Sequence, residues 1–382
     1  MKFIHSHIST GRGSVLLTLQ KRVALCLLAF VLALITTGCS HHYAVQDTST
    51  HMVTVMGVRQ VRIPKTIGKV FCSNPIGTVD VYTLAPQKLA GWNFKLTSED
   101  LQYIRAEYRS LPALGVWMGT GATPNTEEIT KVHPDVILCF WSIDESGRQM
   151  ADQIQKQTHL PVLLMDYNID SVDKVYRYLG GLLGVSKRAE TLAQDSRSRL
   201  DKITAAIGNV PEAQQPKIYI SEGAGGLQTD PVGSLHIQDV ADLLHLDNVV
   251  NLTGAAGQGM GMPTVSVEQL MNWDPHFIFV NEYNLNSTEK SDIYSRILQN
   301  TQWSGITAVR DKKVYDIPQT PFSWFGKPPS VMRVLGSAWV ASLLFPDQVK
   351  LDIRQEAKDF FKLYLNDNLT DAQLDAMLAH AE

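Results

Sequence analysis

The feature that most constrains the fold is a long segment without strand signals in the middle of the chain. From Val172 to Ile207, apolar residues recur at helical spacing, with one break at Gly184. On both sides of this segment, short apolar runs alternate with longer amphipathic runs, which is typical of α/β units with parallel sheets. The sequence therefore predicts two α/β lobes that are separated by one long helix or by a broken pair of helices.

Short apolar runs are the predicted strands, at residues 69–72, 88–91, 136–140, 162–165, 217–221, 277–281 and 313–316. The main predicted helices are at residues 125–131, 149–158, 236–244, 267–272 and 329–344. We expect an α/β fold in which two Rossmann-like lobes with mainly parallel sheets are joined by a long connector helix, with a ligand cleft between the lobes. The N-terminal lobe, the connector, the C-terminal lobe and a C-terminal helical extension are predicted at 56–170, 171–210, 211–346 and 347–382.

The N-terminus has the pattern of an export signal. Four basic residues and no acidic ones occur in residues 1–38, and the apolar run 23–35 is too short to span a bilayer. The residues before Cys39 resemble a bacterial lipobox, although Thr36 stands where Leu is usual. We predict a lipoprotein signal peptide over 1–38, lipidation of Cys39 and a flexible tether over 39–55. An ordinary signal peptide, cut near the same point, is the alternative.

This N-terminus predicts an extracytoplasmic protein, in the periplasm or at the cell surface, that is held to a membrane by its lipid. Without the predicted signal peptide the chain keeps 30 basic against 38 acidic residues, which is a net charge of −8. An acidic protein of this kind is unsuited to binding nucleic acid through phosphates. A content of 44% hydrophobic residues also excludes a disordered chain.

Each predicted lobe contains the same short pattern, at residues 123–137 and 264–278. In both copies a Glu precedes a Pro by seven residues, and an Ile follows the Pro by three. The Glu residues, Glu127 and Glu268, fall in the first turn of a predicted helix, where an acidic side chain suits the helix dipole. The pattern indicates a loop, a short helix, a turn and a strand that occur once in each lobe.

Together these segments resemble the helical-backbone substrate-binding proteins of ABC importers, which deliver iron–siderophore, haem, cobalamin and related metal compounds. The resemblance covers about residues 56–346 and depends on the order and spacing of 125–137, 179–190 and 267–275. It implies a small metal-containing ligand, and an ABC permease with its ATPase as partner. It also implies a binding protein without enzymatic activity, with no cofactor of its own and no nucleic-acid partner. We expect a monomer.

In this family one exposed Glu on each lobe docks onto Arg pockets of the permease. By motif position, the resemblance implies that Glu127 and Glu268 are these residues. Two carboxylates on opposite lobes would give a two-point electrostatic contact. The alternative is that each Glu only stabilises the start of its own helix.

In two-lobed α/β proteins, ligands lie in the crevice outside the carboxyl ends of the strands. The loops that follow the predicted strands are rich in tryptophan, which suits a bulky and partly apolar ligand. We predict ligand contacts from Trp92, Trp117, Trp141, Glu222, Met260, Tyr283, Trp324, Lys327 and Arg333. The alternative for the tryptophans is that several of them only fill the ends of the lobes.

The possible ligands differ in charge and would therefore need different side chains in the site. An anionic ferric catecholate would need Lys327 and Arg333, although Arg333 falls in a predicted helix and could be structural. An oxyanion such as molybdate would need backbone N–H groups and hydroxyls, which the Gly-rich residues 257–262 could supply. A bare metal ion would need clustered ligands, and candidates such as His236 and Glu282 lack close spacing. We rank a metal chelate first, an oxyanion second and a bare metal third.

An anchored extracytoplasmic enzyme and an adhesive lipoprotein are the alternatives of other classes. The sequence has no Gly-x-Ser-x-Gly elbow, no His-Glu-x-x-His and no Walker loop. Adhesion would not explain the aromatic residues after the strands. Cys72 and Cys139 end two strands that are neighbours in the resembled family. Export permits a disulfide between them, but we expect two buried free thiols.

Overall fold

The computed structural model describes residues 49–117, 124–252, 262–282 and 292–382, so the predicted signal peptide and Cys39 lie outside the described residues. No helix in these ranges is long and apolar enough to cross a membrane. The described chain begins with an antiparallel hairpin of β1 (Thr50–Val55) and β2 (Arg59–Pro64). This hairpin begins inside the predicted tether. It escaped prediction because most of β1 is exposed or only partly buried and carries little apolar signal.

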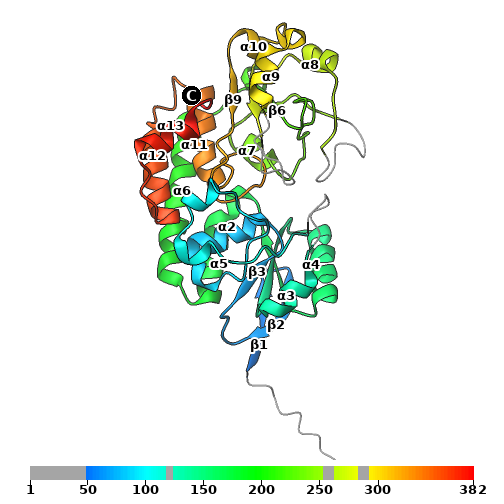
Figure 1. The fold of residues 1–382 in the computed structure, drawn as a ribbon, viewed down its shortest axis with the longest axis vertical. Helices are drawn as coiled ribbons and strands as arrows, with labels where there is room; N and C mark the ends of the chain where they lie inside the picture. Colours follow the sequence, from blue (N-terminus) through cyan, green and yellow to red (C-terminus); the bar gives the residue numbers. More distant parts are fainter. Residues whose placement is uncertain (1–48, 118–123, 253–261, 283–291) are drawn as a thin grey trace, which may run out of the picture. The chain divides into compact units, whose positions relative to one another are not determined.

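The N-terminal sheet has three parallel strands in the order β3-β4-β5: Val70–Cys72, Val136–Trp141 and Val162–Asp166. Helices cover both of its faces (Figure 1): α2 (Pro75–Leu84) and α5 (Val172–Leu183) on one, α3 (Thr126–Val132) and α4 (Glu145–Thr158) on the other. Residues along each strand alternate between these two apolar clusters. Burial on both faces explains why the strands read as continuous apolar runs.

The C-terminal sheet has four parallel strands in the order β7-β6-β8-β9: Asp247–Asn248, Lys217–Ser221, Phe277–Val280 and Val314–Asp316. One face packs against α8 (Val267–Trp273) and α9 (Ile293–Gln299), and the other packs against α7 (Gln238–Leu243) and α11 (Met332–Leu344). The short helix α10 (Thr307–Arg310) precedes β9. The two sheets confirm the predicted α/β fold with parallel strands.

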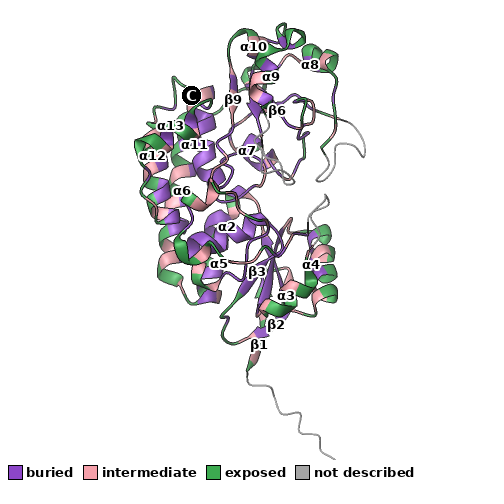
Figure 2. Cartoon of the chain, viewed as in Figure 1, coloured by how far each residue is buried: buried purple, intermediate pink, exposed green. Residues whose placement is uncertain are grey.

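Two predictions of local structure were wrong or incomplete. The predicted strand at 88–91 is instead a 3₁₀ turn, Pro86–Lys88, followed by a single bridge between Leu89 and Val70. Helix α2 was missed because every one of its residues is buried, which leaves no apolar stripe at helical spacing. Figure 2 shows α2 and α11 as largely buried helices.

The connector is a broken pair of helices, α5 and α6 (Ser186–Ile207), as one of the two predicted alternatives stated. Gly184 ends α5 in the left-handed region, with φ 71°. At the crossing, a Cβ on Gly180 would lie 2.2 Å from the Ala189 Cβ, so only glycine permits this close approach. Arg188 donates to the carbonyls of Thr83 and Leu363 and so ties α2 to the C-terminal extension.

The C-terminal extension is helical and packs on the connector. It consists of α12 (Ile353–Phe360), a π-helical turn (Phe361–Leu365) and α13 (Asp371–Leu378), and α12 packs on α11. The remaining 3₁₀ turns are Asp100–Gln102, Ala106–Tyr108, Ile169–Ser171, Glu212–Gln214 and Thr301–Trp303. One continuous buried cluster runs from the N-terminal sheet through α5, α6 and α11 to the C-terminal sheet.

The predicted internal repeat is present in both lobes. Helices α3 and α8 have seven residues each. The side chains of Asn125 and Ser266 cap their N-termini by accepting backbone hydrogen bonds. Both helices end at a left-handed residue, His133 with φ 49° and Asp274 with φ 48°, before a proline and a buried strand. The two lobes therefore place their repeat glutamates at equivalent helix starts.

Candidate functional site

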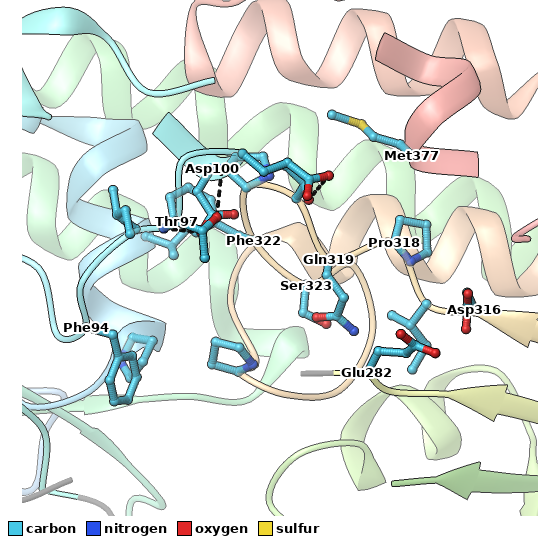
Figure 3. A pocket seen from close by; sticks show the side chains of 18 of the residues that line it. Phe94, Thr97, Asp100, Glu282, Asp316, Pro318, Gln319, Phe322, Ser323 and Met377 are labelled. Atoms are coloured by element: carbon cyan, nitrogen blue, oxygen red, sulfur yellow. Dashed lines mark hydrogen bonds between the residues drawn. The ribbon is translucent and has the colours of Figure 1, made fainter. Parts of the chain in front are cut away.

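A cavity of about 820 Å³ opens at the carboxyl ends of β3, β8 and β9. Its wall is formed by the start of α2, the loop 92–100, the residues that follow β8 and β9, and the end of α13 (Figure 3). The wall thus comes from both lobes and from the C-terminal extension. Its volume lies in the range of pockets that bind molecules of drug size.

Aromatic rings hold the two lobes together beside this cavity. Phe322, in the loop after β9, lies with its ring centroid 6.1 Å from that of Tyr82 and 6.2 Å from that of Trp92. Trp92 is only 3% exposed, and its Nε1 donates to the Tyr108 carbonyl at 3.0 Å. Thr320 donates to Glu99 across the same junction at 3.3 Å. The wall therefore presents fixed, partly apolar surfaces.

Polar side chains fix the loop that carries Trp92. Asn93 donates to the carbonyls of Cys72 and Gly115, at 2.9 and 3.0 Å, and so links this loop to the end of β3. Asp100 accepts from the backbone N–H of Thr97 at 3.0 Å and from its hydroxyl at 2.8 Å. These bonds hold the loop 92–100 against the end of β3.

The charged groups of the wall are mainly carboxylates. Among the described residues these groups are Glu99, Asp100, Glu282, Asp292 and Asp316, with Lys95 and His380. Burial raises the pKa of Glu282, and the negative charges of Asp316 and Asp292 raise it further. His380 lies with its Nδ1 3.0 Å from a carboxylate oxygen of Asp316. The described part of the wall therefore contains more carboxylates than basic side chains.

A buried charge network lies beside the cavity, at the end of β6. Lys327 places its Nζ 2.7 Å from Glu222 and 3.1 Å from Asp230, and Asn281 donates to Glu222 at 2.7 Å. Burial and the Asp230 charge raise the pKa of Glu222 to about 7. Burial alone would raise the pKa of Asp230, but the nearby His236 and Lys327 hold it below its usual value. Lys327 is thus neutralised within the protein.

Arg333 makes a buried ion pair at the start of α11. Its Nη1 lies 2.6 and 2.7 Å from the two carboxylate oxygens of Asp239, and its Nη2 donates to the Tyr167 carbonyl at 2.7 Å. Asp239 also accepts from the backbone N–H of Ile169 at 2.7 Å. The pair therefore connects the C-terminal lobe to the start of the connector, and its role there is structural.

The other predicted ligand residues lie in different places. Trp117 donates from Nε1 to Gln157 at 2.7 Å, Trp141 packs partly buried at the end of β4, and Trp324 is fully buried. Within the described residues, Trp92 is the predicted ligand contact that lines the cavity. Met260 and Tyr283 lie outside the described residues. Ligand contact by each of these residues stays a prediction.

Sequence reasoning missed much of the wall. Residues 94–100 follow the predicted Trp92 loop, but their polar sequence gives no binding signal. Met377 and His380 belong to the C-terminal extension, which was predicted outside both lobes, so nothing in the sequence placed them at the cavity. Phe322 and Gln319 lie close in the sequence to the predicted contact Trp324, which could have indicated them.

In the described ranges no group of three or more His, Cys, Asp or Glu side chains could hold a metal ion. His236 instead contacts Asp230, with its Nδ1 2.8 Å from the carboxylate. Cys72 and Cys139 are buried free thiols in neighbouring strands, as expected. Cys72 ends β3, but Cys139 lies inside β4, two residues before the strand ends at Trp141. Burial raises the pKa of Cys139 to about 12, which keeps the thiol protonated.

The two repeat glutamates are on the surface. The Glu127 side chain is 82% exposed and lies 3.4 Å from Lys131. Glu268 is also exposed, and hydrogen bonds from its own backbone N–H and from Ser266 lower its pKa. Each carboxylate stands in the first turn of a matching helix and is open to a partner.

The buried carboxyl group of Asp80 makes the stability of the fold depend on pH. It lies on α2, and burial raises its pKa from 3.8 to about 7, against the lowering effect of the Val331 backbone and Arg333. The folded protein therefore keeps this proton at pH values where the unfolded chain has lost it. The contribution of Asp80 to the free energy of unfolding is fully present below pH 3.8 and is lost as the pH rises to about 7.

We expect the melting temperature of the protein to fall between pH 5 and 7, because the folded protein keeps the Asp80 proton that the unfolded chain has already lost. Asp80→Asn, which mimics the protonated form, should reduce this fall by roughly 3 °C. Asp347→Asn, at a 97% exposed side chain, is the control and should leave the profile unchanged. Melting curves across the pH range measure both, and identical slopes for Asp80→Asn and the wild type would contradict the expectation.

Two parallel α/β sheets, a pair of connector helices and a cavity at the strand ends define a two-lobed solute-binding protein. The chain belongs to the periplasmic binding protein family, whose model matches residues 95–321. This membership confirms the resemblance found in the sequence. It also confirms the expectation of a binding protein rather than an enzyme.

Relatives and solved structures agree with this assignment. The molybdate-binding protein MolA of Haemophilus influenzae is 29% identical over 111 residues, which are 29% of this chain and only 30% of MolA. The haem uptake protein IsdE of Staphylococcus aureus is 22% identical over 56% of this chain and 69% of its own length. A solved ABC transporter solute-binding protein from Sulfurospirillum deleyianum has a TM-score of 0.75 and 27% identity, covering 85% of this chain and 98% of that chain.

Proposed function

We propose that the protein is the substrate-binding component of an ABC importer, and that it captures an iron–siderophore or a similar metal chelate and delivers it to the permease. The observation that carries this proposal is the cavity of about 820 Å³ at the strand ends, in a chain of the periplasmic binding protein family. Its size and its aromatic wall suit a chelate better than a bare ion.

The proposal includes an ABC permease with its ATPase as the partner, and a monomer in solution. Glu127 and Glu268 are the proposed docking residues, supported by their exposure and by their equivalent positions in the repeat. The proposal also includes a lipid anchor on Cys39 that keeps the protein extracytoplasmic. The basic, apolar and lipobox-like order of the N-terminal sequence supports this anchor.

An oxyanion such as molybdate is the second candidate ligand. The observation that favours it is the 29% identity to MolA over part of the chain. The cavity volume favours the chelate, because a tetrahedral oxyanion would leave most of about 820 Å³ unfilled.

One experiment tests the ligand and the anchor together. We expect mass spectrometry and metal analysis of the protein, purified from membranes of its own host, to show one metal-containing small molecule per chain. The mass of the N-terminal peptide should correspond to acylated Cys39. Variant Cys39→Ser should carry the same ligand but no lipid. Purification with molybdenum would favour the second candidate, and turnover of a substrate would overturn the proposal.

A further inference from the structure

We infer that Gln319 is a specificity-determining residue, which offers the ligand a hydrogen-bond acceptor of fixed orientation and so selects a chelate with an N–H or O–H group. Gln319 follows β9 and lines the cavity of about 820 Å³ (Figure 3). The inference deepens the proposed function and rests on it, because it assumes that this cavity is the ligand site. A series of hydrogen bonds from the buried charge network to Gln319 supports it.

The series of hydrogen bonds starts at the buried Glu222 carboxylate, directly after β6. Lys327 donates from Nζ to Oε2 of Glu222 at 2.7 Å. Asn281, which follows β8, donates from Nδ2 to the other oxygen, Oε1, at 2.7 Å. Burial and the Asp230 charge raise the pKa of Glu222 to about 7, so at pH 8 this group is largely ionised and only accepts hydrogen bonds. The Asn281 amide therefore turns its NH₂ group toward Glu222.

The orientation of Asn281 determines that of Gln319. The Oδ1 of Asn281 accepts a hydrogen bond from Nε2 of Gln319 at 2.8 Å. A side-chain amide has one oxygen and one NH₂ group, and their positions follow from the hydrogen-bond network. Reversing the Gln319 amide would place its oxygen against the oxygen of Asn281, which is repulsive. Because Gln319 uses its NH₂ group for Asn281, its Oε1 is the atom that remains for a ligand.

The Oε1 atom of Gln319 needs a donor that the described part of the protein does not supply. The atom is buried, and none of the described residues donates a hydrogen bond to it. Two hydroxyl groups nearby in the sequence are used elsewhere: Thr320 donates to Glu99 at 3.3 Å, and Ser323 donates to the Phe325 carbonyl at 3.1 Å. A buried acceptor without a donor is unfavourable. A ligand that brings an N–H or O–H group to this atom removes that cost.

This acceptor distinguishes the candidate ligands by their chemistry. A chelate with amide N–H or hydroxyl groups on its outer surface can donate to Oε1 of Gln319. Molybdate has only acceptor oxygens at neutral pH, so it would place an oxygen against Oε1. A site that hydrogen-bonds its ligand through a buried polar group discriminates against analogues that leave this group unpaired. Gln319 therefore favours the chelate over the oxyanion for a reason that is independent of cavity volume.

The test uses two complexes that differ in one kind of group. Full-length protein is titrated by calorimetry at pH 8 with a neutral cyclic ferric trihydroxamate that has secondary amide N–H groups, and with its N-methylated analogue. The two complexes have the same charge and the same iron coordination. We expect the wild type to bind the N–H complex about tenfold more tightly than the methylated one. We expect Gln319→Met to bind the two complexes about equally, because the acceptor is gone.

A matched control and a second variant separate the acceptor from the shape of the wall. Gln302→Met, in an exposed turn, should keep the wild-type ratio of the two affinities. Melting curves show whether each variant is folded, and Gln319→Ala serves if methionine disturbs the wall. A change in shape alone would alter both affinities together and keep their ratio.

Three results would overturn the inference and leave the transport proposal intact: a wild-type ratio near one, a ratio that survives in both Gln319 variants, or a failure of both complexes to bind. If neither complex binds and the protein from its own host has no metal-containing small molecule, the proposed function itself is wrong.

Discussion

Reversing both repeat glutamates, Glu127→Lys with Glu268→Lys, is expected to abolish uptake of the ligand by cells while its affinity for the isolated protein stays unchanged. Both side chains are exposed in the first turns of equivalent helices. They would therefore form a two-point contact with a basic permease surface, and reversal turns two attractions into two repulsions. We expect uptake to fall by roughly 100-fold or more, measured with radiolabelled metal chelate in cells.

The control for this prediction is Glu212→Lys with Asp347→Lys. These exposed residues lie outside the repeat, and the exchange changes the net charge by the same amount. Normal uptake in this variant would show that the loss of uptake depends on the positions of Glu127 and Glu268 and not on the net charge of the protein. Uptake that survives reversal of Glu127 and Glu268 would show that each glutamate only stabilises its own helix.

Replacing Arg333 by methionine is expected to lower the free energy of unfolding by about 3–5 kcal/mol. The substitution keeps an unbranched side chain of similar reach but leaves the buried Asp239 without its ion-pair partner. Burial already raises the pKa of Asp239 against the effect of Arg333, so the unpaired carboxylate should take up a proton or open the contact to Ile169. Denaturant unfolding at pH 7 measures the loss.

A double variant distinguishes the loss of the ion pair from a loss of packing around Arg333. Arg333→Met with Asp239→Leu removes both charges and should recover a large part of the lost stability, because no buried charge remains unpaired. Arg354→Met, in the exposed pair with Asp375, should have a much smaller effect. A small loss for Arg333→Met, or no recovery in the double variant, would contradict the structural role of this pair.

Local signals in the sequence were enough to find most of the framework. All strands of the two sheets except the two-residue β7 were recognised, because burial on both faces makes them short, apolar and separated by helices. The repeat was recognised because capping residues and a following proline have fixed spacing. Helix α2 and the hairpin β1–β2 were not recognised, since one is buried all round and the other is largely exposed.

The candidate site was harder to predict because its chemistry depends on pairs that are distant in the sequence. Lys327 was correctly placed near the strand ends, but its partner Glu222 is 105 residues away. Arg333 and Asp239 are separated by 94 residues. From the sequence alone, a basic residue near a cleft is expected to bind a ligand. The structure shows that a buried carboxylate already pairs with it. The contribution of α13 to the wall could likewise not be predicted, because it depends on how the C-terminal extension packs on the lobes.

The buried cluster that passes through α5, α6 and α11 also limits how this protein can be recombined. In many two-lobed proteins each lobe has its own core, so lobes can be exchanged between homologues as modules. Here the connector helices and α11 contribute side chains to a cluster that both sheets share. A chimera that joins one lobe to a foreign partner would cut through this cluster, so a viable exchange must carry the connector, α11 and the C-terminal helices as one piece.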